Sequence, residues 1–172
     1  MTRSIVFLLD RSGSMETCRD DVIGGFNAFV ADQKALGGNL TLIQFDDKYE
    51  VVYSETPLDE VGPLTRETFV PRGSTALLDA IGKTIKEGKS QAPLFIIFTD
   101  GLENTSLTYT KAHVKDLIEQ KTKEGWTFMY LGANQDAFAE AGSMGISRAQ
   151  NFDVTRTPEV FRTLSQTASQ YV

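Results

Sequence analysis

Short apolar runs alternate along the chain with longer segments whose apolar residues recur at helical spacing. A short run rich in β-branched and aromatic residues is typical of a buried strand, whereas i, i+3, i+4 spacing is typical of an amphipathic helix. The runs predict strands over residues 5–9, 39–45, 49–54, 94–99, 126–132 and 151–154. The periodic segments predict helices over residues 16–36, 77–85, 107–123, 135–141 and 157–171.

The regular alternation of strands and helices predicts an α/β fold, a doubly wound, mostly parallel sheet with helices on both faces. Residues 46–48 are a tight turn, and the strands on either side of it must be antiparallel because so short a connection cannot cross the sheet. Residues 55–74 contain three prolines and little periodicity. Such a long irregular stretch in a compact domain is typical of a functional or mobile segment.

Two of the predicted helices carry residues that set their limits or their packing. Gly24 and Gly25 lie inside the helix over 16–36, where they cost about 1–2 kcal/mol. We expect a close approach of this helix to the sheet to explain that cost. The last helix is expected to begin with Thr157 as its cap and Pro158 at its first position.

A cluster of oxygen-bearing side chains follows the first strand directly. Asp10, Ser12 and Ser14 occupy alternate positions, and Gly13 allows the backbone to turn sharply between the two serines. Their side-chain oxygens can therefore point to one place above the end of the strand. A ligand set made only of oxygen suits a hard cation such as Mg²⁺ or Mn²⁺.

Three residues cannot complete an octahedral site, and two later stretches offer further oxygen ligands. Thr75 lies in a loop of small residues that leads into the helix over 77–85. Asp100 repeats the arrangement at Asp10, because a buried strand runs directly into an aspartate and Gly101 follows. In a doubly wound sheet a binding crevice forms at the carboxyl ends of the strands, where the strand order reverses.

The D-x-S-x-S motif, the distant threonine and the strand-ending Asp-Gly together resemble the von Willebrand factor A domain, over essentially the whole chain. The resemblance implies a Rossmann-like six-stranded sheet of order 3-2-1-4-5-6 with only the third strand antiparallel. It also implies a metal-ion-dependent adhesion site, whose ligands here would be Asp10, Ser12, Ser14, Thr75 and Asp100. The expected cofactor is Mg²⁺, with Mn²⁺ or Ca²⁺ as alternatives.

The family's site also implies a role for each ligand and a mode of recognition. Ser12 and Ser14 would bind the metal directly, and Thr75 would do so in the ligand-engaged form. Asp10 and Asp100 would act mainly through water and by accepting hydrogen bonds from the hydroxyls. A cation held largely by neutral oxygens keeps much of its charge, so the expected partner is a protein that offers an Asp or Glu carboxylate.

Composition limits the class of protein. The chain has 172 residues, which suits a single domain over 1–172, and its net charge of -6 argues against a nucleic-acid-binding surface. We find no apolar stretch long enough to span a membrane and no signal-peptide core, and we expect no membrane partner. The single cysteine, Cys18, excludes an intrachain disulfide and indicates a reducing compartment, so we expect a cytoplasmic protein.

Two other functions stay open beside the metal-dependent binding module. A metal-assisted hydrolase or phosphatase is conceivable, but the sequence offers no positioned nucleophile or base and no basic clamp beyond Arg11 and Arg72. We therefore expect that the protein is not an enzyme. We expect Cys18 to be a buried thiol and His113 to be a surface residue, neither with a catalytic role. In the third hypothesis the metal only stabilises a scaffold subunit.

Two more aspartates near the expected site have open roles. Asp46, at the end of a strand, either forms the following turn or tunes the metal site. Asp79 either braces the loop that carries Thr75 or is solvated on the helix surface.

Overall fold

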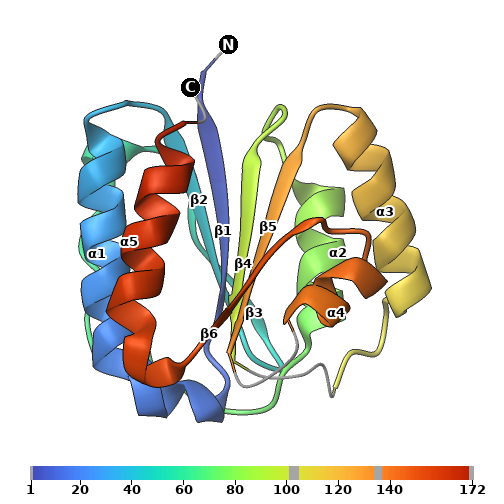
Figure 1. Cartoon of the computed structure of the whole chain (residues 1–172), viewed down its shortest axis with the longest axis horizontal. Coiled ribbons are helices and arrows are strands. Elements are labelled where there is room, and N and C mark those ends of the chain that lie inside the picture. The colour runs from blue at the N-terminus through green and yellow to red at the C-terminus, as the bar shows by residue number, and fades with distance from the viewer. Residues whose placement is uncertain (1, 101–104, 134–136, 171–172) are drawn as a thin grey trace.

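The structure is a computed structural model that describes residues 2–100, 105–133 and 137–170. Its six-stranded sheet has the order β3-β2-β1-β4-β5-β6 (Figure 1). Only β3 is antiparallel to its neighbour. Both the order and the orientation confirm the expectation. The strands are β1 Ser4–Asp10, β2 Asn39–Phe45, β3 Tyr49–Pro57, β4 Leu94–Thr99, β5 Thr127–Ala133 and β6 Arg148–Phe152.

Helices cover both faces of the sheet, as the alternation predicts. In Figure 1, α1 and α5 lie together on one face, and α2, α3 and α4 lie on the other. The α-helices are α1 Arg19–Lys34, α2 Leu77–Glu87, α3 Lys111–Lys123, α4 Ala137–Ser143 and α5 Thr157–Ala168. The short 3-10 helices are η1 Gly13–Cys18, η2 Leu58–Glu60 and η3 Val154–Arg156. No helix among the described residues is long and apolar enough to cross a membrane.

The strand β1 is buried along its whole length because it packs on helices from both sides. Phe7 belongs to the core shared with α1 and α5, where its ring contacts Phe26, Phe29 and Phe161. Leu8, on the opposite face, belongs to the core beneath α2 and α3. The unbroken apolar run before Asp10 is the result of this two-sided burial.

The predicted starts of two helices were wrong by one or more residues. The helix α3 begins at Lys111 instead of residue 107, because the backbone N–H groups of residues 107–109 donate to the carboxylate of Asp79. Thr110 then caps the helix, since its Oγ1 accepts from the backbone N–H of His113 at 3.1 Å. At the last helix the N-cap is Arg156, which makes no side-chain capping hydrogen bond, and Thr157 is the buried first residue of the helix.

Two other elements differ from the predicted ones, the first in helix type and the second in its position along the chain. The 3-10 helix η1 occupies the first turn of the segment predicted as one helix from residue 16. The strand β6 covers Arg148–Phe152 instead of 151–154, because its register is set by pairing with β5.

Gly25 packs against α5 and not against the sheet, which corrects the expectation for the paired glycines. A Cβ atom built on Gly25 would lie 2.3 Å from Cδ2 of Phe161, a buried residue of α5. At Gly24 a Cβ would meet no atom within 4 Å. Only Gly25 is therefore required for the close approach of α1 and α5.

We expect the two glycines to respond to alanine in opposite directions. Gly25→Ala forces Phe161 out of its core position and lowers the free energy of unfolding by about 1–3 kcal/mol. Gly24→Ala raises it by about 0.5–1 kcal/mol, because alanine favours a helix interior and nothing obstructs its side chain. Urea unfolding of both variants measures the difference. Equal effects in the two variants would contradict this packing.

Candidate metal site at the C-terminal edge of the sheet

Asp10 joins the ends of the two central strands. It ends β1 and is 0 % exposed. Its Oδ1 accepts from the backbone N–H of Ser12 at 2.7 Å, and its Oδ2 accepts from Oγ1 of Thr99, the last residue of β4, at 2.7 Å. The carboxylate is thus fixed where β1 and β4 meet, at the point where the strand order reverses.

The two serines and Asp100 lie together beside it. The hydroxyl oxygens of Ser12 and Ser14 are 3.3 Å apart, and Ser14 donates to Oδ1 of Asp100 at 2.8 Å. Ser12 and Asp100 are buried, whereas Ser14 is exposed. The structure therefore brings these four predicted side chains into one cluster that reaches solvent at Ser14.

The loop that carries Thr75 borders this cluster on two sides. The backbone N–H of Gly13 donates to the carbonyl of Gly73 at 3.1 Å, and the N–H of Thr105 donates to the carbonyl of Thr75 at 3.2 Å. Gly73 has a φ of +70°, a conformation that favours glycine. Thr75 itself is 3 % exposed. The loop is thus tied both to the serine loop and to the segment after Asp100.

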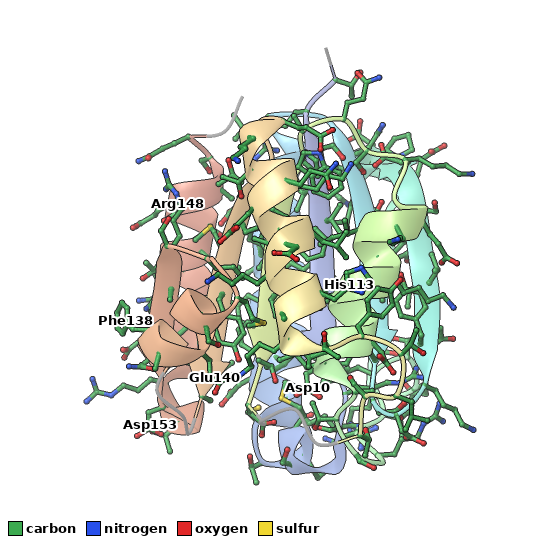
Figure 2. The ribbon with its side chains drawn as sticks, turned by 90° about the vertical axis from the view of Figure 1, so that its right-hand side faces the viewer. Asp10, His113, Phe138, Glu140, Arg148 and Asp153 are labelled. Atoms are coloured by element: carbon green, nitrogen blue, oxygen red, sulfur yellow. The ribbon has the colours of Figure 1, made fainter. Side chains whose placement is uncertain are left out.

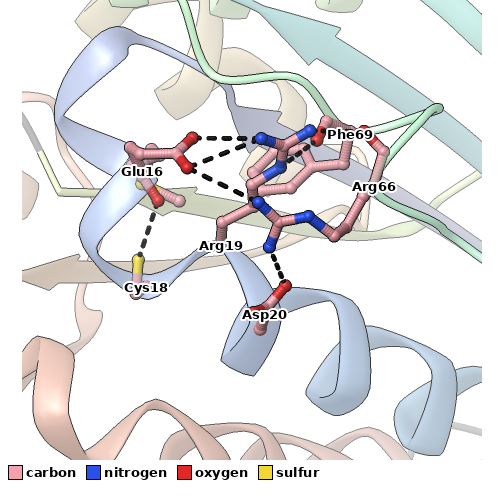
Figure 3. Close-up of polar contacts among 7 residues, drawn as sticks. Glu16, Cys18, Arg19, Asp20, Arg66 and Phe69 are labelled. Carbon is pink, nitrogen blue, oxygen red and sulfur yellow. Dashed lines mark hydrogen bonds and ion pairs between the residues drawn. The ribbon is translucent and has the colours of Figure 1, made fainter.

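Ion pairs connect the start of α1 with the segment that precedes the Thr75 loop. Arg66 pairs with Asp20 at 2.5 Å, and Arg19 pairs with Glu16 at 3.3 Å (Figure 3). Arg19 also donates to the carbonyl of Phe69 at 3.0 Å. These contacts fasten residues 66–69 onto the first turn of α1, which follows directly on η1, the helix that carries Ser14. The later part of the predicted irregular stretch, around residues 66–69, is therefore held beside the serine loop.

Burial sets the electrostatics of the two aspartates. It raises the pKa of Asp10 to about 6, although hydrogen bonds from Thr99 and Ser12 oppose this and the nearby charge of Asp100 adds to it. Burial also raises the pKa of Asp100, against the hydrogen bond from Ser14. Among the described residues, neither carboxylate forms an ion pair. A cation between them would remove this unfavourable charge burial.

The donor set fits a hard divalent cation. Across the described residues, no three His, Cys, Asp or Glu side chains come close enough together to hold a metal. Beside the carboxylates of Asp10 and Asp100, the cluster offers the hydroxyl oxygens of Ser12 and Ser14. Oxygen donors of this kind suit Mg²⁺, Mn²⁺ or Ca²⁺ better than softer metals.

Thr99 and Asp46 have roles that the sequence left unassigned or open. Thr99 orients Asp10 through a hydrogen bond from its Oγ1. In the sequence, the only indication of this role is its position directly before Asp100. Asp46 forms the turn, because its Oδ1 accepts from the N–H of Lys48 at 2.6 Å, and it also anchors Arg72 at 3.1 Å and Arg11 at 3.5 Å. Both arginines are thereby bound to Asp46 beside the Thr75 loop.

Asp79 braces the segment after Asp100 and not the Thr75 loop. Its carboxylate accepts three backbone N–H groups, from Leu107, Thr108 and Tyr109, at 2.8–3.0 Å.

Cys18 and His113 do not form a catalytic pair. Cys18 is buried, and burial raises the pKa of its thiol to about 12, so the thiol is protonated at neutral pH. His113 is exposed on α3, beside the ring of Tyr109 and well separated from Asp10 (Figure 2). Both placements agree with the roles expected from the sequence.

Comparison with known proteins gives structural similarity alone. No family model and no curated protein matches the sequence. Proximal thread matrix protein 1 from the mussel byssus, with a zinc-occupied MIDAS motif, is 14% identical over 98% of this chain and 48% of its own, with a TM-score of 0.70. A von Willebrand factor type A protein from Catenulispora acidiphila is 17% identical over 97% of this chain and 42% of its own, with a TM-score of 0.68.

A third similar structure is the open conformation of the pilus adhesin SpaC from Lactobacillus rhamnosus GG. It is 12% identical over 99% of this chain and 30% of its own, with a TM-score of 0.72. The chain spans less than half the length of each of these three proteins. The single-domain organisation of residues 1–172 therefore stays a prediction. The shared architecture covers nearly every residue of this chain, which has the fold of the von Willebrand factor A domain.

Proposed function

We propose that this chain is a metal-dependent protein-binding module. A divalent cation at the C-terminal edge of the sheet engages an Asp or Glu carboxylate of a protein partner. The observation that carries the proposal is the cluster of Ser12, Ser14 and Asp100, joined by contacts of 3.3 and 2.8 Å and open to solvent at Ser14. Its oxygens belong to two loops that follow the central strands, where a ligand has access to a cation.

Each side chain has a role in this proposal. The hydroxyls of Ser12, Ser14 and Thr75 hold the metal, and Asp10 and Asp100 orient the hydroxyls and neutralise the cation. The hydrogen bond from Ser14 to Asp100 supports this division. Mg²⁺ is the proposed ion, with Mn²⁺ and Ca²⁺ as alternatives. A metal-occupied site of the same kind is named in the mussel byssus protein, where the metal is zinc.

Recognition of a carboxylate follows from the charge that the cation retains. Hydroxyl ligands are neutral, so a cation with few carboxylate ligands favours an incoming anion. An adhesin and a thread matrix protein are among the proteins with this fold, which supports binding over catalysis. The cytoplasmic location belongs to the same proposal and rests on the single cysteine.

A hydrolase receives less support from the arrangement of basic residues. Arg11 is buried and pairs with Asp46 and Glu50, and Arg72 pairs with Asp46. Both guanidinium groups are therefore already engaged in ion pairs, which leaves them less suited to bind a phosphate. We propose that the chain is not an enzyme.

The test is capture of a partner from the native host on the immobilised chain. We expect capture in Mg²⁺, loss in EDTA, and loss with Ser12→Ala even in Mg²⁺. Thr17→Ala is the control, because it removes an exposed hydroxyl of η1, the 3-10 helix that Ser12 precedes, and this hydroxyl donates to the backbone carbonyl of Ser14. Capture that survives both EDTA and Ser12→Ala would instead identify a scaffold with a structural metal. Phosphoester turnover that vanishes with Ser12→Ala would identify a hydrolase.

A further inference from the structure

A cavity of about 150 Å³ opens on the α2 face of the sheet, and none of the five predicted metal ligands lines it. Its floor is apolar and is formed by Val6, Ile43, Phe95 and Trp126. An apolar cavity of this size can hold a molecule about as large as benzene. Val6 lies four residues before Asp10, about 13 Å along the strand, so the two sites are separate.

The cavity is bordered by Glu55, whose backbone is unusual. Glu55 has a φ of +45°, although it is not a glycine. The register of β2 and β3 shifts here, so that Ser54 and Glu55 together lie opposite Thr41 as a β-bulge. Glycine is preferred at such a bulge, and a larger residue in this conformation costs about 1–2 kcal/mol. The presence of glutamate at this position points to a use for its side chain.

The carboxylate of Glu55 is held firmly in place. Its Oε1 accepts from Oγ of Ser4 at 3.0 Å, from Oγ1 of Thr41 at 3.4 Å, and from Oγ of Ser90. These three hydroxyls come from β1, β2 and the segment after α2. Within the described part of the chain, Glu55 forms no ion pair. A fixed anion without a counter-ion thus stands beside an apolar cavity.

We propose that this cavity binds a small organic cation, a primary ammonium group carried on an apolar body of about one ring. The ammonium group binds the carboxylate of Glu55, and the apolar body packs on Trp126 and Val6. Glu87 and Lys89 also line the cavity, so that its charged groups are two carboxylates and one amine, which favours a cation. The amine of Lys89 is on an exposed side chain and is screened by solvent. The carboxylate of Glu55 is held in place by three hydroxyls, so it is the charge that a ligand meets in a fixed position. This inference is independent of the proposed metal-dependent function.

Benzylammonium is a suitable probe, and Trp126 reports on it directly. Trp126 is the only tryptophan of the chain, so its indole N–H signal in NMR and its fluorescence are unambiguous. We expect saturable binding with a dissociation constant on the order of 1 mM, as is usual for so small a ligand. Benzyl alcohol, the neutral analogue of similar shape, should bind at least about tenfold more weakly. EDTA should change neither affinity.

The variant Glu55→Gln keeps an acceptor for the three hydroxyls but removes the charge. We expect it to weaken benzylammonium binding at least about tenfold. Glu87→Gln removes a carboxylate that is not fixed and should change the affinity less than threefold. The proposal is overturned if benzylammonium gives no saturable change at Trp126, or if benzyl alcohol binds as well. The comparison of the two ligands uses the unaltered protein and decides the matter even if Glu55→Gln does not fold.

Discussion

Replacing Asp10 by asparagine is expected to weaken Mg²⁺ binding at least about a hundredfold and yet to stabilise the metal-free protein at pH 7. Asp10 is fully buried, and its pKa of about 6 lies some two units above its ordinary value. Burying the ionised carboxylate therefore lowers the free energy of unfolding by about 3 kcal/mol at neutral pH. Asparagine removes this charge and still accepts the hydrogen bond from the N–H of Ser12. The same change removes the anion that neutralises a bound cation.

Two measurements test this pair of effects. Isothermal titration calorimetry with Mg²⁺ should show at least about a hundredfold loss of affinity in Asp10→Asn. Urea unfolding in EDTA should show the gain in stability. Asp116→Asn is the matched control, because it removes an exposed carboxylate from α3 and should change neither quantity. Unchanged Mg²⁺ affinity in Asp10→Asn would contradict the assignment of the site, and a loss of stability would contradict the electrostatic account.

The opposition between the two effects links the fold to the proposed function. The edge of a doubly wound sheet at its reversal point places Asp10 and Asp100 side by side. In the absence of a cation this is an unfavourable arrangement, and the hydrogen bonds from Thr99, Ser12 and Ser14 offset it only in part. Stability is therefore lower than the fold alone would give, which is expected of a site that binds a cation.

The strands and helices could be predicted because their signals are local. The apolar run before Asp10 needed only its length and composition, and the tight turn at residues 46–48 fixed the antiparallel pairing. The strand order 3-2-1-4-5-6 came from the resemblance, since no local pattern specifies which strands become neighbours. A boundary was wrong where a distant side chain intervenes, as Asp79 does at the start of α3.

For the candidate site, too, the contacts that depend on local sequence could be predicted and those that depend on distant pairing could not. Asp10, Ser12 and Ser14 lie within one turn of the chain, so their proximity followed from sequence spacing. Their contact with Asp100 depends on the pairing of β1 with β4, which the sequence alone did not specify. The bond from Thr99 to Asp10 and the β-bulge at Glu55 were missed because neither has a local sequence signal. The assignment of the five residues as metal ligands stays a prediction.

Mg²⁺ affinity is expected to fall as the pH is lowered through 6, by about tenfold for each pH unit below that value. The cation requires the ionised carboxylate of Asp10, which takes up a proton near pH 6 in the metal-free protein. Asp100, whose pKa is also raised, strengthens the dependence. Calorimetric titrations between pH 5 and pH 7.5 measure it. An affinity that is constant across this range would mean that Asp10 does not take part in holding the cation.

The stability of the metal-free protein should respond to pH in the opposite sense. Because the folded pKa of Asp10 is raised, its neutral form contributes stability that is fully present below the ordinary pKa of 3.8 and is lost as the pH rises to about 6. Unfolding in EDTA should therefore show wild type approaching Asp10→Asn in stability at low pH and falling below it by about 3 kcal/mol at pH 7. Saturating Mg²⁺ should raise the stability of wild type at pH 7 and leave Asp10→Asn unchanged. Only a cation bound to this carboxylate gives both results, since a metal bound elsewhere would stabilise the two proteins equally.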